Sequence, residues 1–211
     1  MGLEPLALVF FFFIFGMSVI LHEVAHGYVA YLCGDPTADL KGRLTLNPIP
    51  HIDPMMTIIV PLFFFLSNSG MIFGAAKPVP VNPALLRKWP RDYILVSIAG
   101  VAVNFALAGL LALLIHLVQM PEKPLLSGQT LRALRMGALM NIVLGVFNLI
   151  PIPPLDGSRA FRFLLPRKTR VSYDRLEPFG FIILVVLLMS GALHSVIWPI
   201  IMKLARWMTI L

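Results

Sequence analysis

Residues 22–26 read His22-Glu23-Val24-Ala25-His26 and lie inside an apolar stretch that runs from Leu6 to Leu32. On a helix, side chains four residues apart share a face, so both imidazoles can bind one cation. Glu23 follows the first histidine and can reach a water molecule that the cation activates without binding the metal itself. An ionisable triplet inside a membrane-length apolar segment is costly, which favours a functional zinc site over a chance match.

The composition of the 211-residue chain predicts that lipid covers part of its surface. The residue types AVILMFWYC make up 58%, the charged types DEKR 13%, and the mean hydropathy is +0.87. A globular protein has about 25% charged residues, and a water-soluble fold cannot hide this much apolar surface. The formal net charge is +7, but the basic residues lie between apolar segments, which argues against nucleic-acid binding.

Five apolar segments predict an all-α polytopic membrane protein with a single domain over residues 1–211. About four crossing helices are expected, at residues 6–32, 93–119, 131–152 and 179–207. The remaining segment, about 55–73, is the second in chain order. It contains Pro61 and a Ser-Asn-Ser-Gly turn, so we expect it to be re-entrant. The alternating residues 42–47, GRLTLN, predict that short β-strands occur in the linkers.

A catalytic zinc site needs a third protein ligand and one open position. The candidates in this chain are His51, Asp53, His116, His194 and Asp156. His116 and His194 are isolated histidines in apolar segments and suit packing or interfacial roles better. Asp156 follows a proline-rich stretch that opens the end of a helix, and a glycine comes directly after it. From the residues alone, Asp156 and the His51–Asp53 pair are about equally good third ligands.

Two distant motifs resemble the site-2 protease family of intramembrane zinc metalloproteases, peptidase family M50. They are HEVAH in an apolar span and, far downstream, NLIPIPPLDG at 148–157. The stretches GRLTLNPIPHIDP and KPVPVNP further resemble small bacterial and archaeal members, and the similarity covers about three quarters of the chain. The sequence departs from the family pattern at one position. Val101 replaces the proline that usually follows Ala-Gly in the third apolar segment, 93–119.

This resemblance implies the residues of the site. One zinc ion per chain would be held by His22, His26 and Asp156. Glu23 would be the catalytic base. Asn148 would lie near the active site, where it could bind substrate or support the transition state.

The positions of these residues also predict a topology. His22 and His26 lie near the end of the first span and Asp156 follows the fourth apolar segment, so the two helices must run parallel. An odd number of membrane crossings must then lie between these two helices. Segment 93–119 supplies one crossing, so segment 55–73 is not expected to cross. Twelve of the 17 Lys and Arg residues fall on the side of the site, and the positive-inside rule directs that side to the cytosol.

These observations predict an intramembrane zinc metalloprotease that cuts transmembrane protein substrates in a prokaryotic plasma or inner membrane. The process would be regulated intramembrane proteolysis. One rival is a catalytically silent zinc-binding membrane scaffold, which would need a fourth protein ligand such as His51 or Asp53. Another is a zinc or ion transporter, although the sequence shows no inverted repeat. Only the protease requires Glu23 for turnover.

Overall fold

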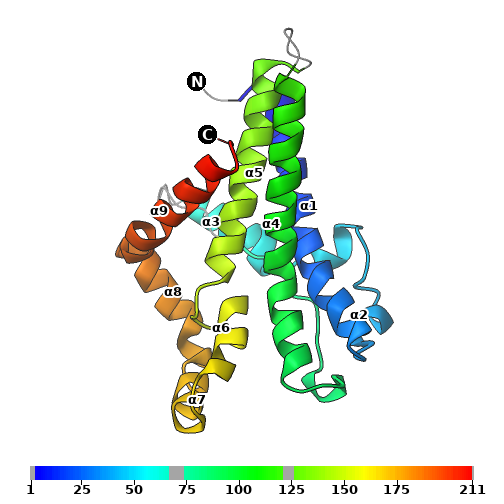
Figure 1. Ribbon diagram of the computed structural model, residues 1–211, viewed down its shortest axis with the longest axis vertical. Helices are drawn as coiled ribbons and strands as arrows, with labels where there is room; N and C mark the ends of the chain where they lie inside the picture. The colour runs from blue at the N-terminus through cyan, green and yellow to red at the C-terminus, as the bar shows by residue number, and fades with distance from the viewer. Residues whose placement is uncertain (1–2, 67–73, 121–125, 211) are drawn as a thin grey trace.

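The computed structural model describes residues 3–66, 74–120 and 126–210, and the elements in this part of the chain are all helical (Figure 1). In chain order they are α1 (Pro5–Leu32), α2 (Thr37–Leu40), η1 (Ile49–His51), η2 (Pro54–Ile59), α3 (Val60–Leu66), η3 (Pro83–Leu85), α4 (Arg91–Gln119), α5 (Gly128–Asn148), α6 (Asp156–Phe161), η4 (Arg162–Leu164), α7 (Arg167–Asp174), η5 (Glu177–Phe179), α8 (Gly180–Met189) and α9 (Ala192–Trp207).

Helices α1, α4 and α5 form the central bundle, and each is long and apolar enough to cross a membrane. Figure 1 shows that α1 and α5 run in the same direction while α4 runs the opposite way. Large apolar side chains such as Leu6, Phe13 and Leu110 are exposed on these helices. An apolar outer surface of this kind suits contact with lipid.

Small residues let these three helices pack closely. A Cβ at Gly137 of α5 would lie 2.7 Å from Ile14 Cγ2 of α1, and one at Gly145 would lie 2.9 Å from Phe105 Cζ of α4. Because lipid is as apolar as the side chains, helix association in a membrane depends on such close packing. A buried apolar core continues from α4 and α5 to the C-terminal helix, through Ala108, Ile115, Leu134, Ala138, Ile142, Ile201 and Ala205.

The predicted span at 179–207 is not one straight helix. Helix α8 ends at Met189 and α9 begins at Ala192, and the helical stretches Arg167–Met189 and Ala192–Trp207 meet at 77°. Gly191 lies at this break with a left-handed φ of +73°, a conformation that glycine adopts readily at the end of a helix. The described residues therefore contain three candidate membrane-spanning helices, or four if the bent pair forms one span.

The predicted re-entrant segment at 55–73 is described as far as Leu66. It begins as the π-helical η2 and continues as α3, which together are shorter than the ~20 residues that a spanning helix needs. The Asp53 carboxylate caps η2 by accepting hydrogen bonds from the backbone N–H groups of Met55 and Met56, both at 2.9 Å. Residues 67–73 lie outside the described part of the chain, so a re-entrant path remains a prediction.

The prediction of short β-strands in the linkers is wrong, because the described residues contain no strand. In segment 42–47, Gly42 has a left-handed φ of +62° and belongs to a turn that follows α2. Further along, Thr45 Oγ1 accepts the N–H of Asn47, and Asn47 Oδ1 accepts the N–H of Ile49, both at 3.1 Å. These local side-chain hydrogen bonds replace the pairing with a neighbouring strand that the alternation had suggested.

Candidate metal centre

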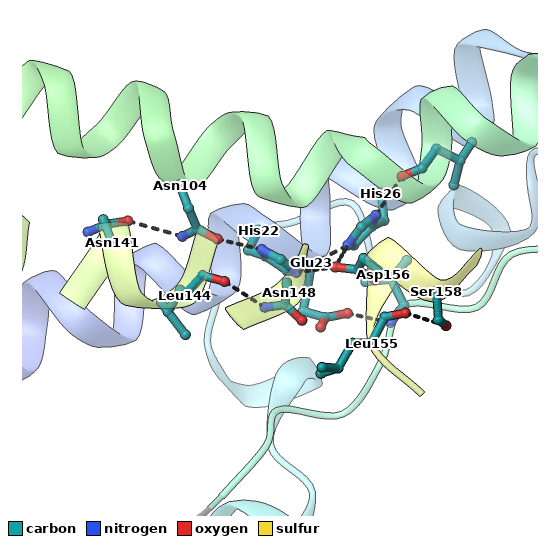
Figure 2. Close-up of polar contacts among 12 residues, drawn as sticks. His22, Glu23, His26, Asn104, Asn141, Leu144, Asn148, Leu155, Asp156 and Ser158 are labelled. Atoms are coloured by element: carbon teal, nitrogen blue, oxygen red, sulfur yellow. Dashed lines mark hydrogen bonds and ion pairs between the residues drawn. The ribbon is translucent and has the colours of Figure 1, made fainter. Parts of the chain in front are cut away.

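Three buried side chains from distant parts of the sequence converge at one point, as Figure 2 shows. His22 and His26 come from α1, and Asp156 is the first residue of α6. The two Nε2 atoms are 3.1 Å apart, and Asp156 Oδ2 lies 3.0 Å from that of His22 and 3.1 Å from that of His26. We call these three residues the His-His-Asp triangle. They are the members of the sequence-predicted site that the fold brings together.

The backbone and side-chain acceptors at Nδ1 define the histidine tautomers. His26 Nδ1 lies 2.7 Å from the carbonyl oxygen of Val96, and His22 Nδ1 lies 2.6 Å from Asn104 Oδ1. Carbonyl oxygens only accept hydrogen bonds, so each Nδ1 carries the proton and donates it. Each Nε2 atom then keeps a lone pair that faces the centre of the triangle, as in most metal-binding histidines.

The residues present fit a zinc ion. Neutral imidazole nitrogens and a carboxylate are ligands that zinc prefers, and adjacent ligands of a tetrahedral zinc lie about 3.3 Å apart when the bonds are ~2.0 Å. The sides of the triangle, 3.0 to 3.1 Å, are close to that spacing. Two lone pairs and a carboxylate oxygen at these distances repel one another unless a cation lies between them. The chemistry of the triangle therefore calls for a metal ion.

A buried chain of side-chain amides fixes the orientation of Asn104 (Figure 2). Asn104 Nδ2 donates to Asn141 Oδ1 at 3.0 Å, and Asn141 Nδ2 donates to the Gly137 carbonyl at 2.9 Å and to Ser18 Oγ at 2.8 Å. Because the carbonyl can only accept, the direction of each link is set and Asn104 Oδ1 must face His22. The site residues predicted from the sequence did not include this chain, although polar residues within apolar spans are the signal that finds it.

Gly100 of α4 lies directly against both imidazoles. A Cβ at this position would be 2.5 Å from His26 Nε2 and 2.6 Å from His22 Nε2, closer than real Cβ atoms approach other atoms. We predict that Gly100→Ala displaces an imidazole and lowers zinc affinity at least about 10-fold. Chelator competition on the purified protein measures this affinity. Gly109→Ala in the same helix, where a Cβ would meet only a methionine methyl at 3.6 Å, is the matched control. Equal zinc affinity of the two variants would contradict the prediction.

The turn that presents Asp156 is held on two sides. A Cβ at Gly157 would lie 2.2 Å from the carbonyl oxygen of Leu149, so only glycine fits there without movement of the backbone. On the other side, the Tyr173 hydroxyl donates to the carbonyl oxygen of Pro151 at 3.0 Å.

Glu23 and Asn148 are outside the triangle. The half-buried Glu23 accepts the backbone N–H of Val79 at Oε2, with a distance of 2.8 Å. Asn148 Nδ2 donates to the carbonyl oxygen of Leu144 in its own helix at 3.1 Å (Figure 2). Among the described residues, Asn148 therefore makes no hydrogen bond to the triangle.

The other sequence candidates for the third ligand make different contacts. His51 Nε2 lies 2.9 Å from the carbonyl oxygen of Thr45, and Asp53 caps η2. His116 and His194 are exposed. Within the described part of the chain, the triangle is the group of His, Cys, Asp and Glu side chains that could share one metal ion.

Comparisons with known proteins give the class of this chain. The family model of peptidase family M50 matches residues 113–191, which include Asn148 and Asp156. A Bacillus subtilis protein named "Putative zinc metalloprotease YwhC" is 40% identical over 186 residues, which cover 87% of this chain and 81% of that protein. Proteins named "Putative zinc metalloprotease Rip2" from Mycolicibacterium smegmatis and Mycobacterium tuberculosis H37Rv are 34% and 31% identical. Those alignments cover 84% and 85% of this chain and 66% of each relative. No solved structure matches the chain significantly.

Membrane-length helices, a buried His-His-Asp triangle and these relatives together define a membrane zinc metalloprotease, with zinc as its metal cofactor. The chain belongs to peptidase family M50, the site-2 protease family, as its two sequence motifs had indicated.

Proposed function

We propose that the protein hydrolyses peptide bonds of transmembrane protein substrates inside the membrane, as in regulated intramembrane proteolysis. The observation that carries this proposal is the location of the His-His-Asp triangle. Two of its members lie on α1, a 28-residue apolar helix of membrane-spanning length, and all three are buried. A site built into such a helix lies at the depth of the membrane, where the peptide bonds of a lipid-embedded substrate also lie.

The proposed metal ligands are His22, His26 and Asp156. Three protein ligands leave one zinc coordination position open, as catalytic zinc sites require. Zinc bound there would lower the pKa of a coordinated water to about 7 and polarise the scissile carbonyl group.

Glu23 is the proposed general base. Its Oε2 is held by the Val79 N–H, whereas Oε1 makes no hydrogen bond with the described residues. Oε1 would take one proton from the attacking water while the water oxygen bonds to the peptide carbonyl carbon. The same proton would pass to the amide nitrogen as the C–N bond breaks.

Asn148 is the proposed support for the substrate. One of its two amide N–H groups donates to Leu144 within α5, which orients the side chain. The second N–H remains available to a substrate carbonyl or to the oxyanion that develops during the reaction.

One structural observation and one chemical argument disfavour the rival functions. A structural scaffold needs a fourth protein ligand, and the candidates His51 and Asp53 are bound elsewhere. Ion transport gives no chemical task to Glu23.

We further propose that the site faces the cytosol of a prokaryotic cell, because most Lys and Arg residues lie on that side in the proposed topology.

Removal of zinc tests the function directly. The purified protein would be reconstituted in liposomes with a set of single-span peptides, and the products would be identified by mass spectrometry. We expect cleavage within the apolar segment, a loss of at least about 100-fold with 1,10-phenanthroline, and recovery when zinc is added. Cleavage restricted to soluble peptides would contradict the intramembrane proposal, and zinc flux without cleavage would favour a transporter.

A further inference from the structure

A short segment without helical structure passes beside Glu23. It consists of residues 77–82, Lys-Pro-Val-Pro-Val-Asn, and we call it the strap. Pro78 and Pro80 have no N–H group, so Val79 has the only backbone donor in the Pro-Val-Pro run. That N–H donates to Glu23 Oε2 at 2.8 Å. The only backbone donor of this run therefore donates to the proposed catalytic carboxylate.

Two buried charged side chains hold the strap on either side of Val79. Arg43, which is 7% exposed, donates from Nη2 to the carbonyl oxygen of Lys77 at 2.7 Å. Asp35, which is 0% exposed, accepts the N–H of Asn82 at 2.6 Å. Burying a charged group is costly unless it is hydrogen-bonded, and each of these charges makes one hydrogen bond to the strap backbone, while Arg43 Nε has no partner among the described residues. These two bonds hold both ends of the strap against the segment that follows α1.

Close packing of Val79 against Gly27 fixes how near the strap lies to α1. Gly27 lies one turn after Glu23 on the same face of the helix. A Cβ at Gly27 would be 2.7 Å from Val79 Cγ1, so the valine side chain occupies the space that glycine leaves. Val79 is buried there, and its N–H meets the carboxylate on the preceding turn.

We propose that the Val79 N–H is a positioning group for the Glu23 carboxylate. It binds Oε2 through a charge-assisted hydrogen bond and so directs Oε1 toward the reacting water. A glutamate side chain otherwise samples several rotamers, and only some of them place an oxygen where a proton must be taken. Val79 acts through Glu23 and supplies no metal ligand. This inference rests on the proposed role of Glu23 as the general base.

The test replaces this N–H with an oxygen atom and leaves the valine side chain unchanged. Incorporation of the α-hydroxy analogue of valine at position 79 converts the amide to an ester. The same replacement at Val81 is the matched control, because the Val81 N–H makes no hydrogen bond within the described residues. Both full-length proteins would be loaded with zinc and assayed with a single-span peptide that the wild type cleaves.

We expect the position 79 ester to lower kcat about 10- to 100-fold, with KM within about twofold of wild type. Zinc per chain should stay at the wild-type level, and the position 81 ester should keep at least about half of the wild-type kcat. A structural role alone would affect zinc content or both esters. It would not give a kcat change confined to position 79.

Four outcomes would overturn the proposal. They are equal kcat values for the two esters, a similar loss in both, zinc loss from the position 79 ester, and a rise in kcat that marks the contact as a restraint. Each of these leaves the proposed function intact if the wild type cleaves and Glu23→Gln does not. Full turnover by Glu23→Gln would instead refute the assigned role of Glu23, and the positioning proposal would fall with it.

Discussion

Replacing Glu23 with Gln is expected to lower peptide cleavage by about 10²- to 10⁴-fold, the usual contribution of a general base. The amide has nearly the same shape as the carboxylate but cannot take up a proton at neutral pH. Glu23 is outside the His-His-Asp triangle, so the variant should bind zinc as well as the wild type does. Cleavage of a single-span peptide and zinc per chain, measured on the same preparation, check both expectations.

Glu4→Gln, at the residue before the same helix, provides a matched control. Glu4 is an exposed carboxylate before the first turn of α1 and makes no capping hydrogen bond. The Glu4→Gln variant should therefore cleave the peptide at the wild-type rate. Wild-type turnover by Glu23→Gln would remove the general base from the mechanism, and loss of zinc from that variant would show that the residue supports the metal site instead.

The second large effect is expected for Asp156→Ala, which should release zinc. In this variant only the two neutral imidazoles remain as ligands, and the anionic carboxylate is lost. The loss of affinity should therefore exceed the 10- to 100-fold typical of an outer-shell partner, reaching at least about 100-fold. Metal analysis after dialysis against a chelator, together with the cleavage rate, measures the result. Cleavage should fall in parallel with zinc content.

Asp53→Ala and His51→Ala are the matched controls, since these residues were the competing candidates for the third ligand. Both should keep zinc. Loss of the η2 cap in Asp53→Ala should cost about 1 kcal/mol of stability and leave the metal bound. Full zinc retention by Asp156→Ala, or zinc loss from either control, would assign the third ligand to the linker before α3.

The local part of the site could be predicted from the sequence. The four-residue spacing of His22 and His26 places both imidazoles on one helical face whatever the helix packs against, because it depends only on helix geometry. Apolar segments of sufficient length identify α1, α4 and α5 for the same local reason. The break at Gly191 was missed, because one glycine in an apolar run does not by itself specify a bend.

The third member of the triangle depended on the tertiary structure. Asp156 is 130 residues from His26. From the residues alone, Asp156 was no better a candidate for the third ligand than His51 and Asp53, and only the family resemblance favoured it. The packing of α1, α4 and α5 brings it to the imidazoles. The expected strand at 42–47 failed for a related reason: pairing needs a neighbour in space, and alternation in the sequence cannot supply one.

The sequence by itself thus determined the features that depend on local periodicity and composition, namely a lipid-embedded helical chain and a histidine pair poised to bind a metal. Only the tertiary structure decided which distant groups surround that pair. Gly100 makes room for the imidazoles, Asn104 orients one of them, and the Val79 N–H holds Glu23. Helix repeats are set by neighbouring residues, whereas these contacts arise from the packing of segments far apart in the chain, and no local pattern encodes them.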